Sequence, residues 1–185
     1  MRFRLFAVLL CSVAAGAVSI SQTQPVFAQA APAQKPVLSP PAKADVTLTD
    51  ATITIDYSSP SMRGRKIFGG LVPYGKVWRT GANPATTLKT TGNLKIGGLS
   101  VPAGTYTLYS LPTADGWKLI VNKQTGQWGT VYNEPQDLGR VPMSVASATP
   151  LEAMVIDFEK TSGDTTELHV KWADVDASVE VSAAK

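Results

Sequence analysis

A polar turn stands out in a sequence that is otherwise poor in reactive side chains. In residues 75–89, GKVWRTGANPATTLK, an apolar run ends at Trp78 and Arg79, and Asn83 follows in a turn that contains Gly and Pro. The guanidinium of Arg79 carries five donors in a planar fork, which can grip a carboxylate or tie down the carbonyl groups of its own turn. The stretch is therefore either a ligand-binding loop or a strand end held to its turn.

The tryptophans divide into two groups by their local pattern. Trp117 and Trp172 lie in alternating strands and are predicted to be in the core, whereas Trp78 and Trp128 stand at loop boundaries. The latter two predict an exposed platform on which a sugar ring or a peptide aromatic stacks, or alternatively plugs at the ends of the fold. We expect a glycan or another small polar ligand to be bound, and the candidate ligand-binding residues are Trp78, Arg79, Asn83, Thr87, Asn122, Trp128 and Arg140.

The sequence offers few routes to catalysis, and we expect no catalytic residue, metal or cofactor. His169 is the only histidine and has no accompanying cysteine, so neither a His/Cys zinc site nor a Cys-His pair can be built. No serine stands in a Gly-x-Ser-x-Gly elbow, and Asp174-Val175-Asp176 is only a weak calcium pattern. A pair of carboxylates suffices to hydrolyse a glycan, which is the alternative function, and the candidate acids are Asp56, Glu134, Asp137 and Asp157.

A compact basic group, Arg63, Arg65 and Lys66, lies in a Gly-containing stretch upstream of the turn. Such a group attracts phosphate, acidic sugars or lipid headgroups, although three charges also suit a solvated loop tip.

The elements that position these residues are predicted to be β-strands, because apolar and polar residues alternate along much of the chain. Alternating apolar and polar residues, separated by Gly-, Pro- and Asp-containing turns, predict about eight to ten short strands and no helix. That pattern predicts an all-β fold, an antiparallel β-sandwich with a jelly roll as one arrangement. One long, ordered Gly/Pro-rich loop is expected from Ser58 to Pro84. The clearest strands are 52–57, 94–96, 99–101, 105–109, 117–121, 155–160 and 166–172.

The N-terminal residues predict that the protein is exported and are not expected to be part of the folded domain. Residues 1–30 have a short cationic start and an apolar stretch of roughly sixteen residues, shorter than the ~20 of a spanning helix, which is typical of a signal peptide. Cleavage is expected between Ala28 and Ala30, leaving no cysteine because Cys11 is removed. Residues 31–44 predict a Pro/Ala-rich disordered linker and residues 45–185 one domain. We expect a periplasmic or extracellular protein without a membrane span.

Charge argues against nucleic acid as a partner. Without Arg2 and Arg4 the count of Lys and Arg falls from 17 to 15 against 14 Asp and Glu, so the mature chain is close to neutral. Binding nucleic acid takes a concentrated basic face. A protein of the cell envelope is the alternative partner, which would make the chain a structural or docking domain.

Several motifs resemble one family. They are 63–75, RGRKIFGGLVPYG; 77–83, VWRTGAN; Ala85-Thr86-Thr87; 102–106, PAGTY; the strand 117–123; Gln127-Trp128-Gly129; and 138–141, LGRV. Together, across roughly residues 45–160, they resemble the exported bacterial domain-of-unknown-function family twenty-nine eleven. The resemblance implies an exported, mostly β domain and supplies no reaction.

Overall fold

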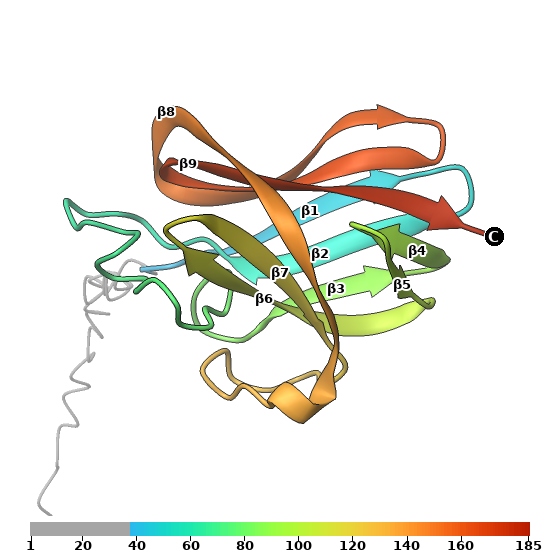
Figure 1. The fold of residues 1–185 in the computed structure, drawn as a ribbon, viewed down its shortest axis with the longest axis horizontal. Helices are drawn as coiled ribbons and strands as arrows, with labels where there is room; N and C mark the ends of the chain where they lie inside the picture. The colour runs from blue at the N-terminus through green and yellow to red at the C-terminus, as the bar shows by residue number, and fades with distance from the viewer. Residues whose placement is uncertain (1–37) are drawn as a thin grey trace, which may run out of the picture. The chain divides into compact units, whose positions relative to one another are not determined.

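The protein, seen in a computed structural model that describes residues 38–185, is built around one antiparallel sheet of nine strands (Figure 1). Within these residues no helix is long and apolar enough to cross a membrane. The strand order is β1-β2-β3-β6-β7-β8-β9-β4-β5. The elements are β1 (Pro41–Thr47), β2 (Thr52–Ser58), β3 (Thr86–Thr90), β4 (Asn93–Ile96), β5 (Leu99–Val101), β6 (Gly104–Thr113), β7 (Gly116–Asn122), the 3-10 helix η1 (Glu134–Gln136), β8 (Asp137–Ser162) and β9 (Thr165–Ala184).

The alternation of the sequence determines which face of each strand is buried. In β2, Ile53 and Ile55 are fully buried, while Asp56 points outward and pairs with Lys89 of the neighbouring strand at 3.0 Å. A period of two places successive side chains on opposite faces, so one face of β2 enters the core and the other stays polar. The predicted all-β antiparallel class is confirmed.

Strand β8 connects the two parts of the sheet. Its first residues, Asp137–Met143, pair with β7, and its later residues, from Ser144 onward, pair with β9. Register shifts on either side of Leu151 interrupt the β8–β9 ladder, and such bulges bend a strand. The hydrogen-bonded order therefore runs through all nine strands without closing into a barrel, and β1 and β5 are its two edges.

The core contains side chains from both parts of this bent sheet. Ile53, Leu108 and Trp117 come from the β1–β7 part, and Met154 and Trp172 from β8 and β9. Trp117 is 4% exposed and Trp172 is 1% exposed, which confirms both as core residues. One continuous core explains how a chain without disulfides within the described residues is held together.

Strand β1 begins before the expected domain start at Asp45. Residues 41–44, which composition assigns to the linker, pair with β2, and Ala44 is buried opposite Ile55. A Pro is compatible with the first position of an edge strand, and a small Ala carries little pattern. The predicted signal peptide and residues 31–37 of the predicted linker lie outside the described residues.

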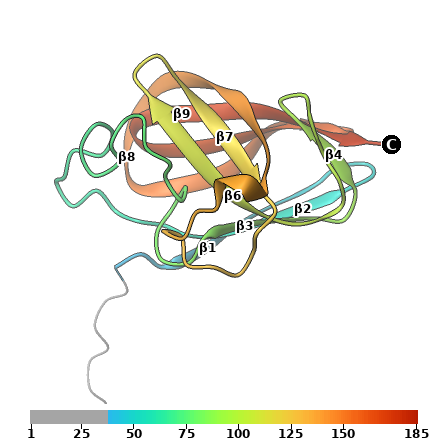
Figure 2. The same cartoon turned by 60° about the horizontal axis from the view of Figure 1, so that its bottom comes forward.

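The long Gly/Pro-rich connection is present between β2 and β3 as loop 59–85, at the end of the fold opposite the C-terminus (Figures 1 and 2). Near its start, the N–H of Met62 donates to the carbonyl of Glu152 in β8 at 2.8 Å. Further along, Trp78 and Ser110 of β6 exchange two backbone hydrogen bonds of 2.7 and 2.8 Å. The loop is thus fixed to both parts of the sheet, which makes it a rigid support for side chains.

Candidate functional site

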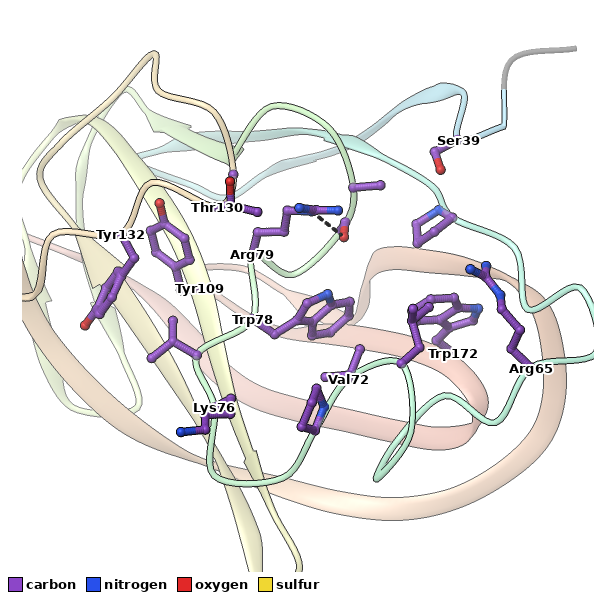
Figure 3. Close-up of a pocket in the computed structure, with 17 residues that line it drawn as sticks. Ser39, Arg65, Val72, Lys76, Trp78, Arg79, Tyr109, Thr130, Tyr132 and Trp172 are labelled. Carbon is purple, nitrogen blue, oxygen red and sulfur yellow. Dashed lines mark hydrogen bonds between the residues drawn. The ribbon is translucent and has the colours of Figure 1, made fainter. Parts of the chain in front are cut away.

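A cavity of about 390 Å³ lies where loop 59–85 meets loop 123–136 (Figure 3). No Asp or Glu stands among the described residues around it. Its wall combines aromatic rings with cations, namely Trp78, Tyr109, Tyr132 and Trp172 with Arg65, Lys76 and Arg79. The cavity therefore has a largely aromatic wall and a positive charge.

Trp78 forms the rigid part of this wall. Its ring stacks on Trp172 with centroids 5.9 Å apart and planes 20° apart, and it meets Trp117 and Phe68 edge to face at 6.3 and 6.1 Å. Such aromatic contacts add to the stabilisation from burial alone. Since Trp78 is only half-buried, one part of a fixed indole remains available to the cavity.

Arg79 lies beside Trp78 and makes few bonds to its own turn. Its Nε donates to the carbonyl of Gly81 across 3.4 Å, a long contact, and no carboxylate pairs with it within residues 38–185. Its stem packs against Gly129, where an added Cβ would come within 2.3 Å of Cδ of Arg79. The side chain is thus held by packing, and its terminal nitrogens remain for another acceptor.

Other residues hold the turn instead. Thr80 is fully buried, shares a 2.7 Å hydrogen bond with Ser110, and accepts a 2.8 Å bond from the hydroxyl of Thr86 at its carbonyl. Its φ of 49° is unusual for a β-branched residue, and Asn83 has a φ of 58°. Such backbone strain costs of order 1–3 kcal/mol, persists only where the surroundings enforce it, and clusters at functional sites.

The remaining loop residues from the predicted set do not all reach the cavity. Asn83 is not part of the cavity wall; its Nδ2 donates to the carbonyl of Ser39 at 3.3 Å, and its backbone carbonyl accepts the N–H of Gly129 at 3.1 Å. Trp128 is 54% exposed and is not part of the cavity wall. Because the pairing with β6 turns Trp78 inward, Trp78 and Trp128 do not form the shared platform that their loop positions predict.

Thr87, Asn122 and Arg140 lie outside the cavity. Thr87 sits in β3 between Asp56 and Thr107, and its hydroxyl donates to the carbonyl of Ala85 at 3.3 Å. No residue of β3, β7 or β8 is part of the cavity wall.

Asn122 is fully buried and fastens loop 123–136. Its Nδ2 donates to the carbonyl of Asn133 at 2.9 Å and to Oδ1 of Asp137 at 2.8 Å, and its Oδ1 accepts the N–H of Gln124 at 2.9 Å. With its hydrogen-bonding groups used internally, Asn122 is a structural residue.

Arg140 acts on the cavity indirectly, through Tyr132. It pairs with Asp137 at 2.9 Å and Glu134 at 2.5 Å, and donates to the hydroxyl of Tyr132 at 2.8 Å. That hydroxyl donates to Asp137 at 2.6 Å, and burial together with this bond raises the pKa of Tyr132 to about 12. Tyr132, a neutral phenol at ordinary pH, is thereby fixed edge to face against Tyr109 at 4.9 Å.

The candidate acids for a hydrolase all have cationic partners. Asp56 pairs with Lys89, and Asp157 pairs with Lys171 at 2.9 Å. Hydrogen bonding to Lys171 is also the main cause that lowers the pKa of Glu159. The buried His169 of β9 lies 2.8 Å from Asp176 of the same strand, and no group of three or more potential metal ligands occurs among the described residues.

The side chains of the basic group Arg63, Arg65 and Lys66 lie in different places in the structure. Arg65 lines the cavity, whereas the backbone N–H of Arg63 donates to Glu152 and its guanidinium to the carbonyl of Leu38. Lys66 lines a second cavity of about 470 Å³, together with Phe68 and Tyr74. Sequence reasoning missed Lys76, Tyr109 and Tyr132 as wall residues, since no local pattern relates their separate segments.

One family model matches the chain, that of "Protein of unknown function (DUF2911)", over residues 39–181. The chain therefore belongs to this family, as the sequence motifs suggest, and the match extends beyond residues 45–160 at both ends. No curated protein and no solved structure matches the chain.

Proposed function

We propose, taking membership of a family without an assigned function as the premise, that this protein binds a small polar ligand without transforming it. The ligand occupies the cavity beside Trp78 and Arg79, and the protein works in the cell envelope after export. The signal-peptide pattern of residues 1–30 supports the location.

The observation that carries the proposal is the construction of this cavity. Its volume of about 390 Å³ falls near the lower end of the ~300–1,000 Å³ of small-molecule sites, which join apolar walls to a few placed polar groups. The stacked Trp78 and Trp172 supply the wall, and Arg79 supplies donors that its own turn does not use. A strained Thr80 that positions Arg79 supports a binding role over a simple strand connection.

Noncatalytic binding is favoured over glycan hydrolysis by the lining of the cavity. A hydrolase needs two carboxylates facing one cleft, and the described residues around this cavity include neither Asp nor Glu. A structural or docking role stays an alternative interpretation, and it predicts that the cavity takes no small molecule.

The proposal is tested with the full chain by thermal shift and tryptophan fluorescence against neutral sugars, peptidoglycan fragments, organic acids, nucleotides and metal ions. A ligand at a hundred times its Kd stabilises the folded state by about 2.7 kcal/mol, which corresponds to a rise in Tm of about 5–11 °C for a domain of this size. Because Trp78 lines the cavity, its emission also changes.

The matched variants are Arg79→Gln, which removes one of the three cations at the cavity, and Lys95→Gln, which removes an exposed cation on β4. We expect the first to reduce the ligand-induced rise in Tm and the second to retain it. If no class of compound changes either Tm or fluorescence of the folded protein, the binding proposal is wrong and docking to a protein takes its place.

A further inference from the structure

The geometry points to an organic acid as the ligand of this cavity. We infer that Arg79 binds the carboxylate and that the apolar body of the acid lies against the half-buried Trp78, on which the buried Trp172 is stacked. This inference rests on the proposed function and narrows it from polar compounds in general to anions.

The distribution of ion pairs in the fold is the first argument. Arg140, Lys89, Lys160 and Lys171 each have a carboxylate within 3.0 Å. The three cations of the cavity, Arg65, Lys76 and Arg79, have no salt-bridge partner in residues 38–185, and no acid lines the cavity. Other described cations, such as Lys95 and Lys118, also lack a salt-bridge partner, but at this cavity three cations line one hollow whose described wall holds no acid. A neutral ligand would leave these cations unpaired.

The state of Arg79 is the second argument. Its stem packs against Gly129, and within residues 38–185 its side chain makes one hydrogen bond, the long contact from Nε to the carbonyl of Gly81. The terminal nitrogens form the fork that matches two carboxylate oxygens, and a half-buried guanidinium lacking acceptors gains more from such a pair than an exposed one does. Since packing already fixes the side chain, little conformational entropy is lost on binding.

The arrangement around the indole rings is the third argument. Figure 3 shows Arg79 on one side of Trp78 and Trp172 and Arg65 on the other, with Val72 beside the rings. Arg65 is itself anchored, donating to the carbonyl groups of Met62 and Ser61 at 2.9 and 2.7 Å. A flat or apolar body on the rings therefore places its acid group beside Arg79, while Arg65 adds positive potential from the far side.

The inference is tested with two matched pairs of probes that differ at one functional group, which is a carboxylate in one member and a neutral group in the other. Phenylacetate is compared with phenylacetamide, and galacturonate with galactose, by calorimetric titration of the full chain. We expect the acid of at least one pair to bind at least tenfold more tightly than its neutral counterpart, and its Kd to rise with salt concentration.

Variants assign that preference to the site. We expect Arg79→Gln to weaken binding of the acid by about ten- to a hundredfold, the loss of one charged hydrogen-bonded pair, and Lys95→Gln to leave it unchanged. Arg79→Lys keeps the charge without the fork and is expected to retain part of the affinity. Circular dichroism shows whether each variant is folded. If a variant does not fold, the salt dependence of acid binding by the wild-type protein still tests the inference.

The outcomes separate the inference from the proposed function. If galactose or phenylacetamide binds as tightly as its acid and Arg79→Gln changes neither, the anion inference is wrong while small-molecule binding stands. If neither these probes nor any compound of the wider panel binds the folded protein, both are wrong.

Discussion

Replacing Gly129 by Ala tests how the structure positions Arg79. A Cβ at Gly129 would lie 2.3 Å from Cδ of Arg79, 3.0 Å from Cβ of Arg79 and 2.8 Å from the carbonyl oxygen of Asn83. Contacts this short force the neighbours to move, and overpacking of this kind costs about 1–3 kcal/mol. For a domain of this size we expect the Tm of Gly129→Ala to fall by about 2–12 °C.

A double-mutant cycle identifies the side chain responsible. In an Arg79→Ala background the shortest contact disappears, because Cδ is removed, whereas the contact with Asn83 remains. We therefore expect Gly129→Ala to cost less in that background than alone, with a coupling of about 0.5–3 kcal/mol measured by denaturant unfolding.

A control glycine separates packing from backbone strain. Gly163 has a φ of 60° and open space around its Cβ direction, in the hairpin between β8 and β9. Gly163→Ala is expected to cost about 1–2 kcal/mol from its backbone conformation, equally with and without Arg79. Equal costs of Gly129→Ala in both backgrounds would refute the packing of Arg79 against Gly129, and with it the preorganised cation on which the anion inference relies.

Two further predictions concern the residues that hold loop 123–136. Asn122→Ala leaves several buried groups without partners and is expected to lower stability by about 3 kcal/mol, or a Tm fall of about 6–12 °C, and a Tm unchanged from wild type would show that the loop is held otherwise. The raised pKa of Tyr132 favours its neutral form in the folded state, so its stabilising contribution is complete below pH 10 and is lost as the pH rises through about 12. Asp137→Asn should move this ionisation back toward 10.0, measured as phenolate absorbance in a difference titration against Tyr132→Phe, and an unmoved titration would contradict the bond to Asp137.

The sequence predicts the strands well where one face of the strand is buried and the other is exposed to solvent. In β2 the alternation of Ile53 and Ile55 with polar residues is unmistakable, and the structure confirms it. Strand β8 is different, because it contains Pro142 and Pro150 and is largely exposed over its middle, so only residues 155–160 show a strand pattern. Its length and bend depend on pairing with β9, which no local window of sequence contains.

The site is predicted only as far as its chemistry is local. Trp78 and Arg79 are adjacent in the chain, and their types indicate the aromatic wall and the cation that the structure shows. Asn122 and Arg140 are equally suitable for binding by residue type. In the structure, however, Asn122 bonds to Asn133 and Asp137, and Arg140 pairs with Asp137, so both hold loop 123–136 in place. Tyr132 enters the cavity wall only because Arg140 and Asp137 hold it there, a relation that depends on three-dimensional register.

The 26 residues of β8 belong to both ladders of the sheet, and this has a consequence for how the protein comes apart. The first residues of this continuous strand pair with β7, the later ones pair with β9, and both parts share one core, so we expect the sheet to open as one cooperative unit instead of two independent foldons. Amide protons on β7 and β9 should then exchange with solvent at the same global rate under conditions that permit only complete opening. The cavity wall contains Tyr109 of β6 and Trp172 of β9, so it is supported from both parts of the sheet.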